Sequence, residues 1–390
     1  MKRISFLLFA LTTLCGATFA ADVAITTVKA PGGGLQPEVF VDADGNLHLL
    51  YFQGEPRAGN LMYTKRPAGA ADFLTSVQVN TTPNAAVAMG TIRGGHLAIG
   101  KDASVHVSWM GSKATLPNPD DHKMSPMLYA RSIDEGASFE PEKNVITNAY
   151  GLDGGGTVAA DGLGNVHVVW HAPKRPGAEG EVNRTVWIAS SKDNGATFAA
   201  EREIWNEKTG VCGCCGLRAF ATPAGETFVL YRAATGGKDR DMYLLRASAD
   251  DGAIRFNGSK AAEWSIQKCP MSSASFALGP NRIGAAWESE DKVFFSVMRP
   301  AAAGRKIGPI ENPRRGNALH KHPSIAFDDD GNILLVWTVG RGWGSAGTAV
   351  WRVFKPNGDP TDQSGEQPGT PPWSKAAAVF HPVDGFLVFY

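Results

Sequence analysis

The chain repeats one pattern of polar and apolar positions. An acidic or polar turn with glycine or asparagine is followed by an alternating apolar segment that ends in an aromatic residue, as in residues 42–51, 101–109 and 161–170. Weaker copies follow, and the final aromatic residues return every 50 to 61 positions. These aromatic residues are Tyr51, Trp109, Trp170, Tyr231, Trp287, Trp337 and Phe389. Alternation with a period of two predicts a strand in each copy.

Each repeat contains further strands around this element. A short apolar segment precedes the turn, as in residues 38–41, 157–160 and 324–327, and a third follows most copies, as in residues 127–131 and 242–246. A meander of about four strands has the size of one propeller blade. Apolar residues on both faces suit blades that are buried against neighbouring blades.

We therefore predict an all-β chain that forms a six- or seven-bladed β-propeller with four-stranded antiparallel blades. The last copy of the pattern ends at the C-terminus and lacks its third strand. Residues 23–28 form an apolar segment that is the candidate to complete this blade and close the ring. Closure by the two ends would hide the strand edges that an open sheet exposes.

The first twenty residues have the pattern of a secretory signal peptide, with Lys2 and Arg3, an apolar run over residues 4–14 and small residues before Ala20. We expect cleavage after Ala20, a periplasmic or secreted location, and a single propeller domain over residues 21–390. The sequence offers no later run of about twenty apolar residues, so no membrane span is expected. Lysine plus arginine and aspartate plus glutamate number 38 each. This balance disfavours nucleic acid as a partner, and we expect a monomer.

Three of the third strands run into a second motif, Ser-x-Asp-x-Gly, and two copies extend to an aromatic residue. The copies consist of Ser132, Asp134, Gly136 and Phe139, of Ser191, Asp193, Gly195 and Phe198, and of the partial set Ser248, Asp250 and Gly252. These hairpins resemble the Asp-boxes (BNR repeats) of sialidases and related propellers. The resemblance implies that the aspartate accepts hydrogen bonds from turn amides, the glycine takes a positive φ and the aromatic side chain plugs the blade. Because Asp-boxes lie away from the active site in that family, they imply a fold and no activity.

A catalytic sialidase of this family has an arginine triad for the substrate carboxylate, a tyrosine nucleophile paired with a glutamate, and an aspartate acid/base. The first arginine of the family sits in an Arg-Ile-Pro motif, where residues 35–37 of this chain read Leu-Gln-Pro. Arg218, Arg232 and Arg240 are the candidates for positive charge in the channel, and Tyr243 is the candidate nucleophile. Inter-blade or surface ion pairs and an ordinary strand tyrosine are the alternative interpretations.

The four cysteines after the signal peptide form two groups. Cys212, Cys214 and Cys215 open the fourth repeat, and Cys269 opens the fifth. Each group precedes the first strand of its blade, so we expect both at the same end of adjacent blades, near the channel mouth. This segment resembles a bacterial branch of Asp-box propellers in which Cys-x-Cys-Cys is followed by Cys-Pro. That resemblance names no substrate.

Three interpretations of the cysteines stay open. In an oxidising compartment, a disulfide from Cys214 or Cys215 to Cys269 would staple two blades, whereas a bond between the adjacent Cys214 and Cys215 would strain the peptide between them. Closely spaced thiolates also suit Cu(I) or Zn(II), although the two Cys-x-x-Cys pairs of a zinc ribbon are absent from the sequence. Catalytic thiol chemistry is the third interpretation. Sulfur atoms that converge with histidine would favour metal, and arginines that converge at the channel centre would favour an enzyme.

The histidines divide into two groups. His48, His106 and His167 occupy one equivalent strand position in the first three repeats, which favours packing or inter-blade hydrogen bonds. The second group lies where loops reach an end of the channel, and its members are candidate accessory ligands. This group consists of His96, His171, His320 and His322.

Two functional hypotheses follow from these features. The first is an exported binding propeller without glycosidase activity, whose site is the cysteine cluster. Its partner would be a small ligand, a glycan or another exported protein. The second hypothesis is an exo-α-sialidase or a related glycoside hydrolase that acts on terminal acidic sugars.

Overall fold

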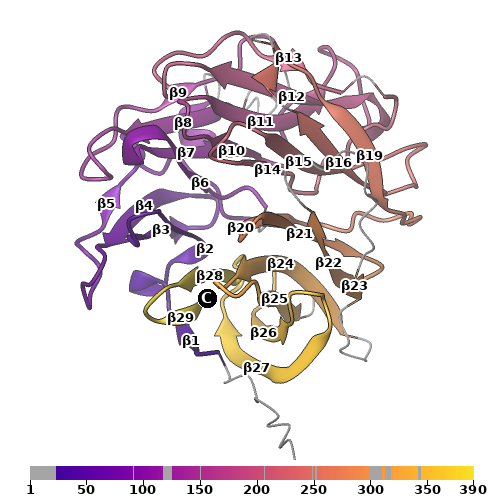
Figure 1. Ribbon diagram of the computed structural model, residues 1–390. Coiled ribbons are helices and arrows are strands. Elements are labelled where there is room, and N and C mark those ends of the chain that lie inside the picture. Colours follow the sequence, from indigo (N-terminus) through magenta and orange to yellow (C-terminus); the bar gives the residue numbers. More distant parts are fainter. Residues whose placement is uncertain are drawn as a thin grey trace, which may run out of the picture.

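The computed structural model describes most of the chain that follows the predicted signal peptide (Figure 1). The described residues are 23–90, 92–116, 125–149, 151–205, 207–247, 249–250, 253–298, 310–311, 318–340 and 344–390. Residues 1–20 lie outside these ranges, as do Ser248 and Gly252 of the partial third hairpin, whose Asp250 is described only as part of a short strand. Within the described ranges, no helix is long and apolar enough to cross a membrane.

Seven sheets follow one another around a central channel, so the described residues form a propeller of seven blades (Figure 1). Six of these sheets have four strands, and the seventh has three. The first strand of each blade packs against the first strand of the next, and the last blade packs against the first. The predicted β-propeller is therefore confirmed with seven blades, and its last blade has three strands among the described residues.

The first three blades follow the first three sequence repeats, with each strand antiparallel to the one before it. Blade 1 consists of β2 (Leu35–Val41), β3 (Leu47–Glu55), β4 (Ala58–Arg66) and β5 (Val77–Gln78). Blade 2 consists of β6 (His96–Ile99), β7 (Val105–Met110), β8 (Met127–Ser132) and β9 (Lys143–Asn144). Blade 3 consists of β10 (Gly156–Ala160), β11 (Val166–Pro173), β12 (Arg184–Ser191) and β13 (Arg202–Glu203).

The remaining blades continue this order, and a small hairpin and short 3-10 turns complete the described elements. Blade 4 consists of β14 (Arg218–Ala221), β15 (Thr227–Arg232), β16 (Met242–Ala247) and β19 (Asn257–Ala262). Blade 5 consists of β20 (Ala274–Gly279), β21 (Arg282–Ser289), β22 (Lys292–Met298) and β23 (Ile310–Glu311). Blade 6 consists of β24 (Leu319–Phe327), β25 (Ile333–Gly340), β26 (Gly347–Phe354) and β27 (Pro360–Thr370). Blade 7 consists of β28 (Ala377–His381), β29 (Gly385–Phe389) and β1 (Ile25–Val28). The hairpin is β17 (Ala249–Asp250) with β18 (Ala253–Ile254), and the 3-10 turns are η1 (Pro31–Gly33), η2 (Lys101–Ala103), η3 (Lys113–Thr115) and η5 (Glu181–Asn183).

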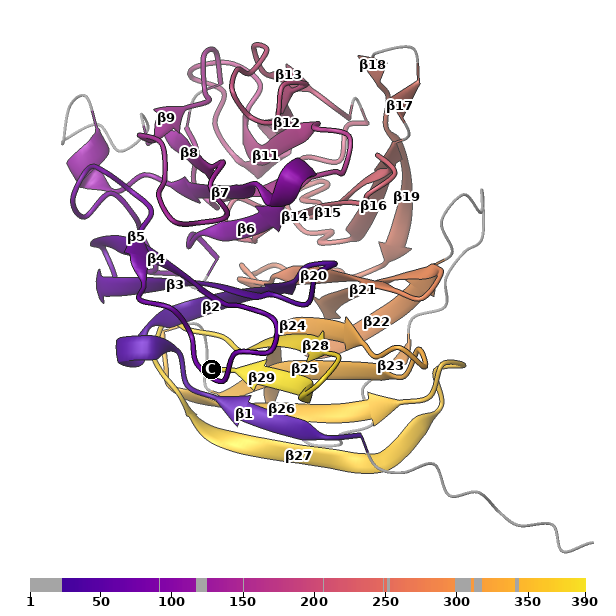
Figure 2. The same ribbon diagram turned by 60° about the vertical axis from the view of Figure 1, so that its left-hand side comes forward.

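The N-terminal strand β1 closes the ring. It pairs in parallel with β29, so that Val28 lies opposite Phe389. Just beyond this pairing, the amide of Ala30 donates a hydrogen bond to the carbonyl of Tyr390 at 3.1 Å. Figures 1 and 2 show β1 beside β29 from two directions. The prediction that residues 23–28 complete the last blade is confirmed, and β29 keeps no open edge on that side.

The aspartate of the repeated turn fixes the start of the long apolar strand. In three repeats its Oδ1 accepts a hydrogen bond from the amide of the asparagine four residues later, at 2.7–2.8 Å, and the asparagine side chain returns a second bond to Oδ2. These pairs are Asp42 with Asn46, Asp161 with Asn165, and Asp328 with Asn332. The long strand therefore pairs with the strand before the turn in the same register in all three repeats. The aromatic residue at the end of the long strand is buried. Trp109, Trp170, Trp287 and Trp337 are at most 2% exposed.

The repeated histidines bond to the neighbouring strand of their own blade. Nδ1 of His48 lies 2.7 Å from the hydroxyl oxygen of Tyr63, and Nδ1 of His106 lies 2.7 Å from that of Tyr129. His167 makes the corresponding contact with a serine hydroxyl at 3.0 Å. All three side chains are buried. The regular spacing of these histidines thus reflects packing within the blades.

The Ser-x-Asp-x-Gly hairpins join the third and fourth strands of their own blades and contact the preceding blade. Asp134 accepts a hydrogen bond from the amide of Ser138 at 2.9 Å, and Gly136 has a φ of 90°. The ring of Phe139 packs edge-on against Tyr63 of the preceding blade, with 5.5 Å between ring centroids. The second hairpin repeats these contacts with Asp193, Thr197, Gly195, Phe198 and Tyr129. Each hairpin therefore presses an aromatic ring against the tyrosine that bonds to a buried histidine.

Substitution of Gly136 tests this contact between blades. A Cβ atom on Gly136 would overlap the ring of Tyr63, and the positive φ disfavours any larger residue. Gly136→Ala should lower the free energy of unfolding by at least about 2 kcal/mol, measured by urea denaturation. Gly45→Ala is a matched control, because Gly45 also has a positive φ but its Cβ would meet only Ala68, at 3.6 Å. The control should cost only about 1 kcal/mol, and equal losses would contradict the inter-blade contact.

The buried histidines predict the acid stability of the propeller. Burial, reinforced by the charge of Arg131, lowers the pKa of His106 from 6.5 to about 3. The unfolded chain binds this proton more tightly, so the stabilising effect is fully present above pH 6.5 and is lost as the pH falls toward 3. His106→Gln should reduce the slope of unfolding free energy against pH in this window by up to about 1.4 kcal/mol per pH unit. Urea denaturation at several pH values measures the slope, and an unchanged slope would show that His106 takes up a proton without unfolding.

Candidate functional site

The two cysteine loops meet at one end of the channel. Residues 212–216 lead into β14 and residues 269–273 lead into β20, the first strands of blades 4 and 5. The amide of Gly216 donates a hydrogen bond to the carbonyl of Ser272 at 2.9 Å and joins the loops. The expectation that the two cysteine groups lie at the same end of adjacent blades is confirmed.

The sulfur atoms of the four cysteines form one cluster. Cys214 and Cys269 form a disulfide that joins blade 4 to blade 5. Sγ of Cys212 lies 3.4 Å from Sγ of Cys214 and 2.9 Å from Sγ of Cys215. The sulfur atoms of Cys212, Cys214 and Cys269 all lie within 4.8 Å of one another. Of the two predicted partners for Cys269, the structure selects Cys214, and Cys212 and Cys215 remain thiols.

The four sulfur positions differ in their access to solvent. Cys212 is 0% exposed and Cys215 is 2% exposed. Cys214 is half-buried, and Cys269 is exposed. The disulfide therefore faces solvent at Cys269, and the two thiols lie behind it.

A methionine that the sequence analysis did not single out adds a fifth sulfur atom. Sδ of Met271 lies 3.4 Å from Sγ of Cys269, and the side chain is 8% exposed. Met271 has a φ of 50°, an unusual conformation for a residue other than glycine and one often found at functional sites. The sequence signal that could have found it is the short spacing Cys-Pro-Met.

Two buried arginines hold positive charge beside the cluster. Arg232 is 1% exposed and donates hydrogen bonds to the Ser272 hydroxyl at 3.1 Å and to the Arg240 carbonyl at 2.6 Å. Arg240 pairs with Glu181 at 2.6 Å. Glu181 in turn accepts a hydrogen bond from the amide of Gly213 at 2.6 Å. This chain of contacts fastens the cysteine loop to the strands and loops behind it.

Charge and hydrogen bonding separate the pKa values of the two free thiols. Burial raises the pKa of Cys215, but the hydrogen bond from Cys212 and the charge of Arg232 outweigh it and lower the pKa to about 6. The pKa of Cys212 is raised, because Cys212 donates that hydrogen bond and is itself buried. At neutral pH, Cys215 is thus the thiolate and Cys212 keeps its proton.

Two candidate histidines lie next to oxygen atoms of the cysteine loops. Nε2 of His171 lies 3.3 Å from the carbonyl oxygen of Cys215, and burial lowers the pKa of His171 to about 3. Nδ1 of His322 lies 3.0 Å from the hydroxyl of Ser273, and the ring of His320 packs on a tryptophan at 5.8 Å. Among the described residues, the group that could hold a metal ion contains cysteines alone. In this group, therefore, no histidine nitrogen joins the sulfur atoms.

The channel centre is filled by a buried charge cluster. Glu38 lies 2.6 Å from both the Arg218 guanidinium and the Lys375 amine, and 3.7 Å from Nδ1 of His96. Burial opposes ionisation of Glu38, but Arg218 and Lys375 hold its pKa well below the usual range. Burial lowers the pKa of His96 to about 3, so this histidine is neutral. The carboxylate of Glu38 thus neutralises the positive charges of Arg218 and Lys375 at this point of the channel.

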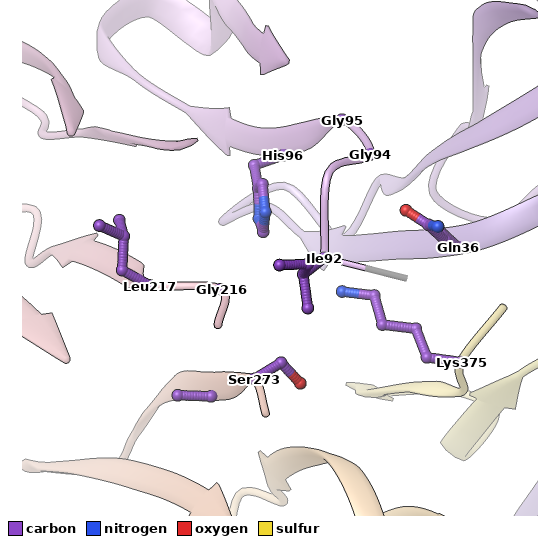
Figure 3. A pocket seen from close by; sticks show the side chains of 10 residues that line it. Gln36, Ile92, Gly94, Gly95, His96, Gly216, Leu217, Ser273 and Lys375 are labelled. Carbon is purple, nitrogen blue, oxygen red and sulfur yellow. The ribbon is translucent and has the colours of Figure 1, made fainter. Parts of the chain in front are cut away.

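A small cavity remains beside this charge cluster. Its volume of about 10 Å³ is close to the space of one water molecule. Figure 3 shows His96 and Lys375 beside it, with Gln36, Leu217 and Ser273 from other blades around it. Toward the other end of the channel, the first strands of all seven blades line a mostly apolar hollow of about 440 Å³. This small cavity itself has no room for a sugar.

The candidate arginines and the candidate tyrosine make contacts in different parts of the structure. Arg218 pairs with Glu38, whereas Arg232 and Arg240 lie beside the cysteine loop. Tyr243 belongs to β16, the third strand of its blade, and its ring stacks on Tyr231 with 5.6 Å between centroids. Each of these four side chains is thus engaged in contacts with other residues of the protein.

A larger pocket borders the cysteine loop. It has a volume of about 850 Å³, and its lining includes Arg93, Asp153 and Arg184. Arg93 pairs with Asp153 at 3.0 Å, and Arg184 lies 3.9 Å from the same carboxylate. A Cβ atom on Gly213 would contact the side chains of Asp153 at 3.1 Å and Arg184 at 3.2 Å. A ligand of moderate size could therefore bind next to the sulfur cluster.

Comparison with known proteins supports the fold. A scan of the sequence against protein-family models finds no match, and a comparison with curated proteins finds none. Among solved structures, the chain is similar to a protein of unknown function from Dyadobacter fermentans DSM 18053, with a TM-score of 0.51 and 14% identity over 85% of this chain and 93% of that one. It is also similar to the Hadza microbial sialidase Hz136, with a TM-score of 0.51 and 12% identity over 86% of this chain and 68% of that one. At such identities, the similarity shows a sialidase-like propeller fold. It gives no information on activity.

Loss of the disulfide should weaken the contact between blades 4 and 5. The bond joins residues that are 55 positions apart in sequence. Cys269→Ser should therefore lower the free energy of unfolding by about 2–4 kcal/mol, measured by urea denaturation without reductant. A reducing agent should cause a similar loss in the unmodified protein and little change in the variant. Equal stability of the oxidised protein and the variant would contradict a stabilising role of the bond.

Proposed function

We propose that this chain is an exported binding propeller without glycosidase activity, and that its sulfur cluster binds Cu(I) when the disulfide is reduced. One observation carries the proposal: three cysteine sulfur atoms lie within 4.8 Å of one another at the channel mouth. Thiolates at this separation can share a single soft cation. Because two of the three sulfur atoms are joined in the disulfide, binding requires reduction of that bond by two electrons.

The donor atoms favour Cu(I) over Zn(II). Thiolate and thioether ligands select Cu(I), and the thioether of Met271 lies 3.4 Å from Cys269. Structural zinc sites take four cysteine or histidine ligands in a tetrahedron, whereas three cysteine sulfur atoms of the described residues lie within 4.8 Å of one another. Several thiolates around a monovalent cation carry net negative charge. The buried guanidinium groups of Arg232 and Arg240 are placed to compensate it.

The disulfide and the filled channel support the other parts of the proposal. A disulfide is expected in an exported protein, in agreement with the signal-peptide pattern of residues 1–20. The Ser-x-Asp-x-Gly hairpins act between blades, which agrees with a structural role for Asp-boxes. At the channel centre, Glu38 occupies the cations that an acidic sugar would need. These features favour a binding role over an exo-sialidase.

Cu(I) binding can be measured by competition with a chromogenic chelator under anaerobic conditions. The fully reduced protein should bind one Cu(I) per chain, and the oxidised protein should not compete. Cys212→Ser, Cys214→Ser and Cys269→Ser should each weaken binding by at least about 100-fold, and Met271→Leu by about 10-fold. Met62→Leu is a matched control in blade 1 and should leave the affinity unchanged.

Several outcomes would overturn the proposal. The absence of Cu(I) binding to fully reduced, folded protein would exclude the metal role. Tighter binding of Zn(II) than of Cu(I) would exclude the assignment of the ion. Turnover of a fluorogenic sialoside that is lost in Arg218→Ala would favour the glycosidase instead.

A further inference from the structure

The arrangement of the thiols behind the disulfide points to a second activity. We propose that the sulfur cluster performs thiol–disulfide exchange, by moving its disulfide between the exposed pair Cys214–Cys269 and the buried pair Cys212–Cys215. This activity needs no metal ion and goes beyond the binding role proposed above. Its substrate is an external dithiol, which exchanges with the exposed pair.

Cys212 is the connecting sulfur in this arrangement. It lies 3.4 Å from Cys214, a member of the disulfide, and 2.9 Å from Cys215, the other free thiol. Reacting atoms about 3–3.5 Å apart are close to the geometry of attack. Cys212 and Cys215 are also separated by two residues, the Cys-x-x-Cys spacing of dithiols that form a disulfide. This pair is hidden in the sequence because Cys214 lies between its two members.

Burial makes the exposed disulfide the route to the buried pair. Cys212 and Cys215 are 0% and 2% exposed, so an external thiol does not reach them directly. Cys269 is exposed and Cys214 is half-buried. Electrons that enter the cluster from a substrate must therefore pass through the Cys214–Cys269 bond.

The migration proceeds in two balanced steps. In the first, Cys212 gives up its proton and attacks Sγ of Cys214, a Cys212–Cys214 bond forms, and Cys269 leaves with the electron pair and takes up that proton through water. In the second, the Cys215 thiolate attacks Sγ of Cys212, a Cys212–Cys215 bond forms, and Cys214 leaves as a thiolate. One disulfide is broken and one is formed overall, so no oxidant is consumed.

The surroundings of the cluster suit the charges of these steps. Each step moves a negative charge from one sulfur atom to another. Arg232 lies behind the pair and reaches Ser272, whose hydroxyl donates a hydrogen bond to Sγ of Cys215 at 3.4 Å. Arg240 is held beside the loop by Glu181. These fixed donors and charges can stabilise thiolates formed inside the protein without rearrangement.

Exchange with the external dithiol is also balanced. A substrate thiolate attacks Cys269, a mixed disulfide forms, and Cys214 leaves as a thiolate. The second thiolate of the substrate then closes the substrate disulfide and releases Cys269. The substrate is oxidised by two electrons, and the cluster is reduced by two electrons.

Disulfide mapping tests the migration. Metal-free protein with one disulfide is equilibrated in a glutathione redox buffer that contains a chelator, quenched with acid, alkylated and digested for mass spectrometry. The unmodified protein should show both Cys214–Cys269 and Cys212–Cys215 bonds. Mapping only Cys214–Cys269 at equilibrium would overturn the proposal.

Two variants make the order of the steps testable. Cys212→Ser removes the connecting sulfur and should leave only the Cys214–Cys269 bond. Cys215→Ser is the matched variant, because it keeps the first step and should accumulate the Cys212–Cys214 bond. Near-ultraviolet circular dichroism checks that both variants are folded. Identical maps for the two variants would contradict the central role of Cys212.

Two dithiol probes distinguish the class of substrate. Oxidation of dithiothreitol and of a reduced Cys-x-x-Cys peptide is followed with stoichiometric oxidised protein. Faster reaction of the peptide would assign a polypeptide dithiol, and faster reaction of dithiothreitol a small one. A failure of both reactions would overturn the exchange activity, whereas Cu(I) binding to the fully reduced protein would remain a separate result.

Discussion

Closure of the ring is the constraint on which the rest of this structure depends. Each blade carries apolar residues on both faces and buries them only between two neighbours, and β1 joins the last blade to the N-terminal end of the first. Once the first strands of the blades form a closed circle, the loops that precede them must gather at one end of the channel. This geometry brings residues 212–216 and 269–273 together, although they belong to different blades.

Two buried clusters of ion pairs lie at that end of the channel. Glu38 is stable in the centre only with Arg218 and Lys375 beside it, because a buried charge without a partner is costly. The same rule applies behind the cysteine loops, where Lys321 contacts Glu288 at 2.6 Å and also donates to the Pro270 carbonyl. The first cluster lies among the first strands of the blades, and the second supports the loop that carries Cys269. The chemistry that we propose therefore lies in the loops of blades 4 and 5.

Structural features that repeat along the chain could be predicted from the sequence, whereas several contacts that occur only once could not. Alternation and the returning aromatic residues locate the blades, and an unpaired segment at residues 23–28 predicts their closure. The disulfide partner of Cys269 stayed open, because the conformation of a glycine-containing loop decides whether Cys214 or Cys215 faces it. Met271 and the role of Arg232 were missed, since neither belongs to a periodic pattern. The small size of the central cavity depends on side chains from several blades and has no local signal at all.

The two activities proposed for the cluster are linked by thermodynamics because they use the same sulfur atoms. A cation that binds only the reduced cluster stabilises that form, and so makes the Cys214–Cys269 bond easier to reduce. Linked equilibria are reciprocal. Oxidation of the cluster must therefore weaken cation binding by the same free energy by which the cation favours reduction. Migration of the disulfide to Cys212 and Cys215 would free Cys214 and Cys269 but leave one thiolate fewer for the ion. The redox state of the compartment would therefore set how much metal the protein holds.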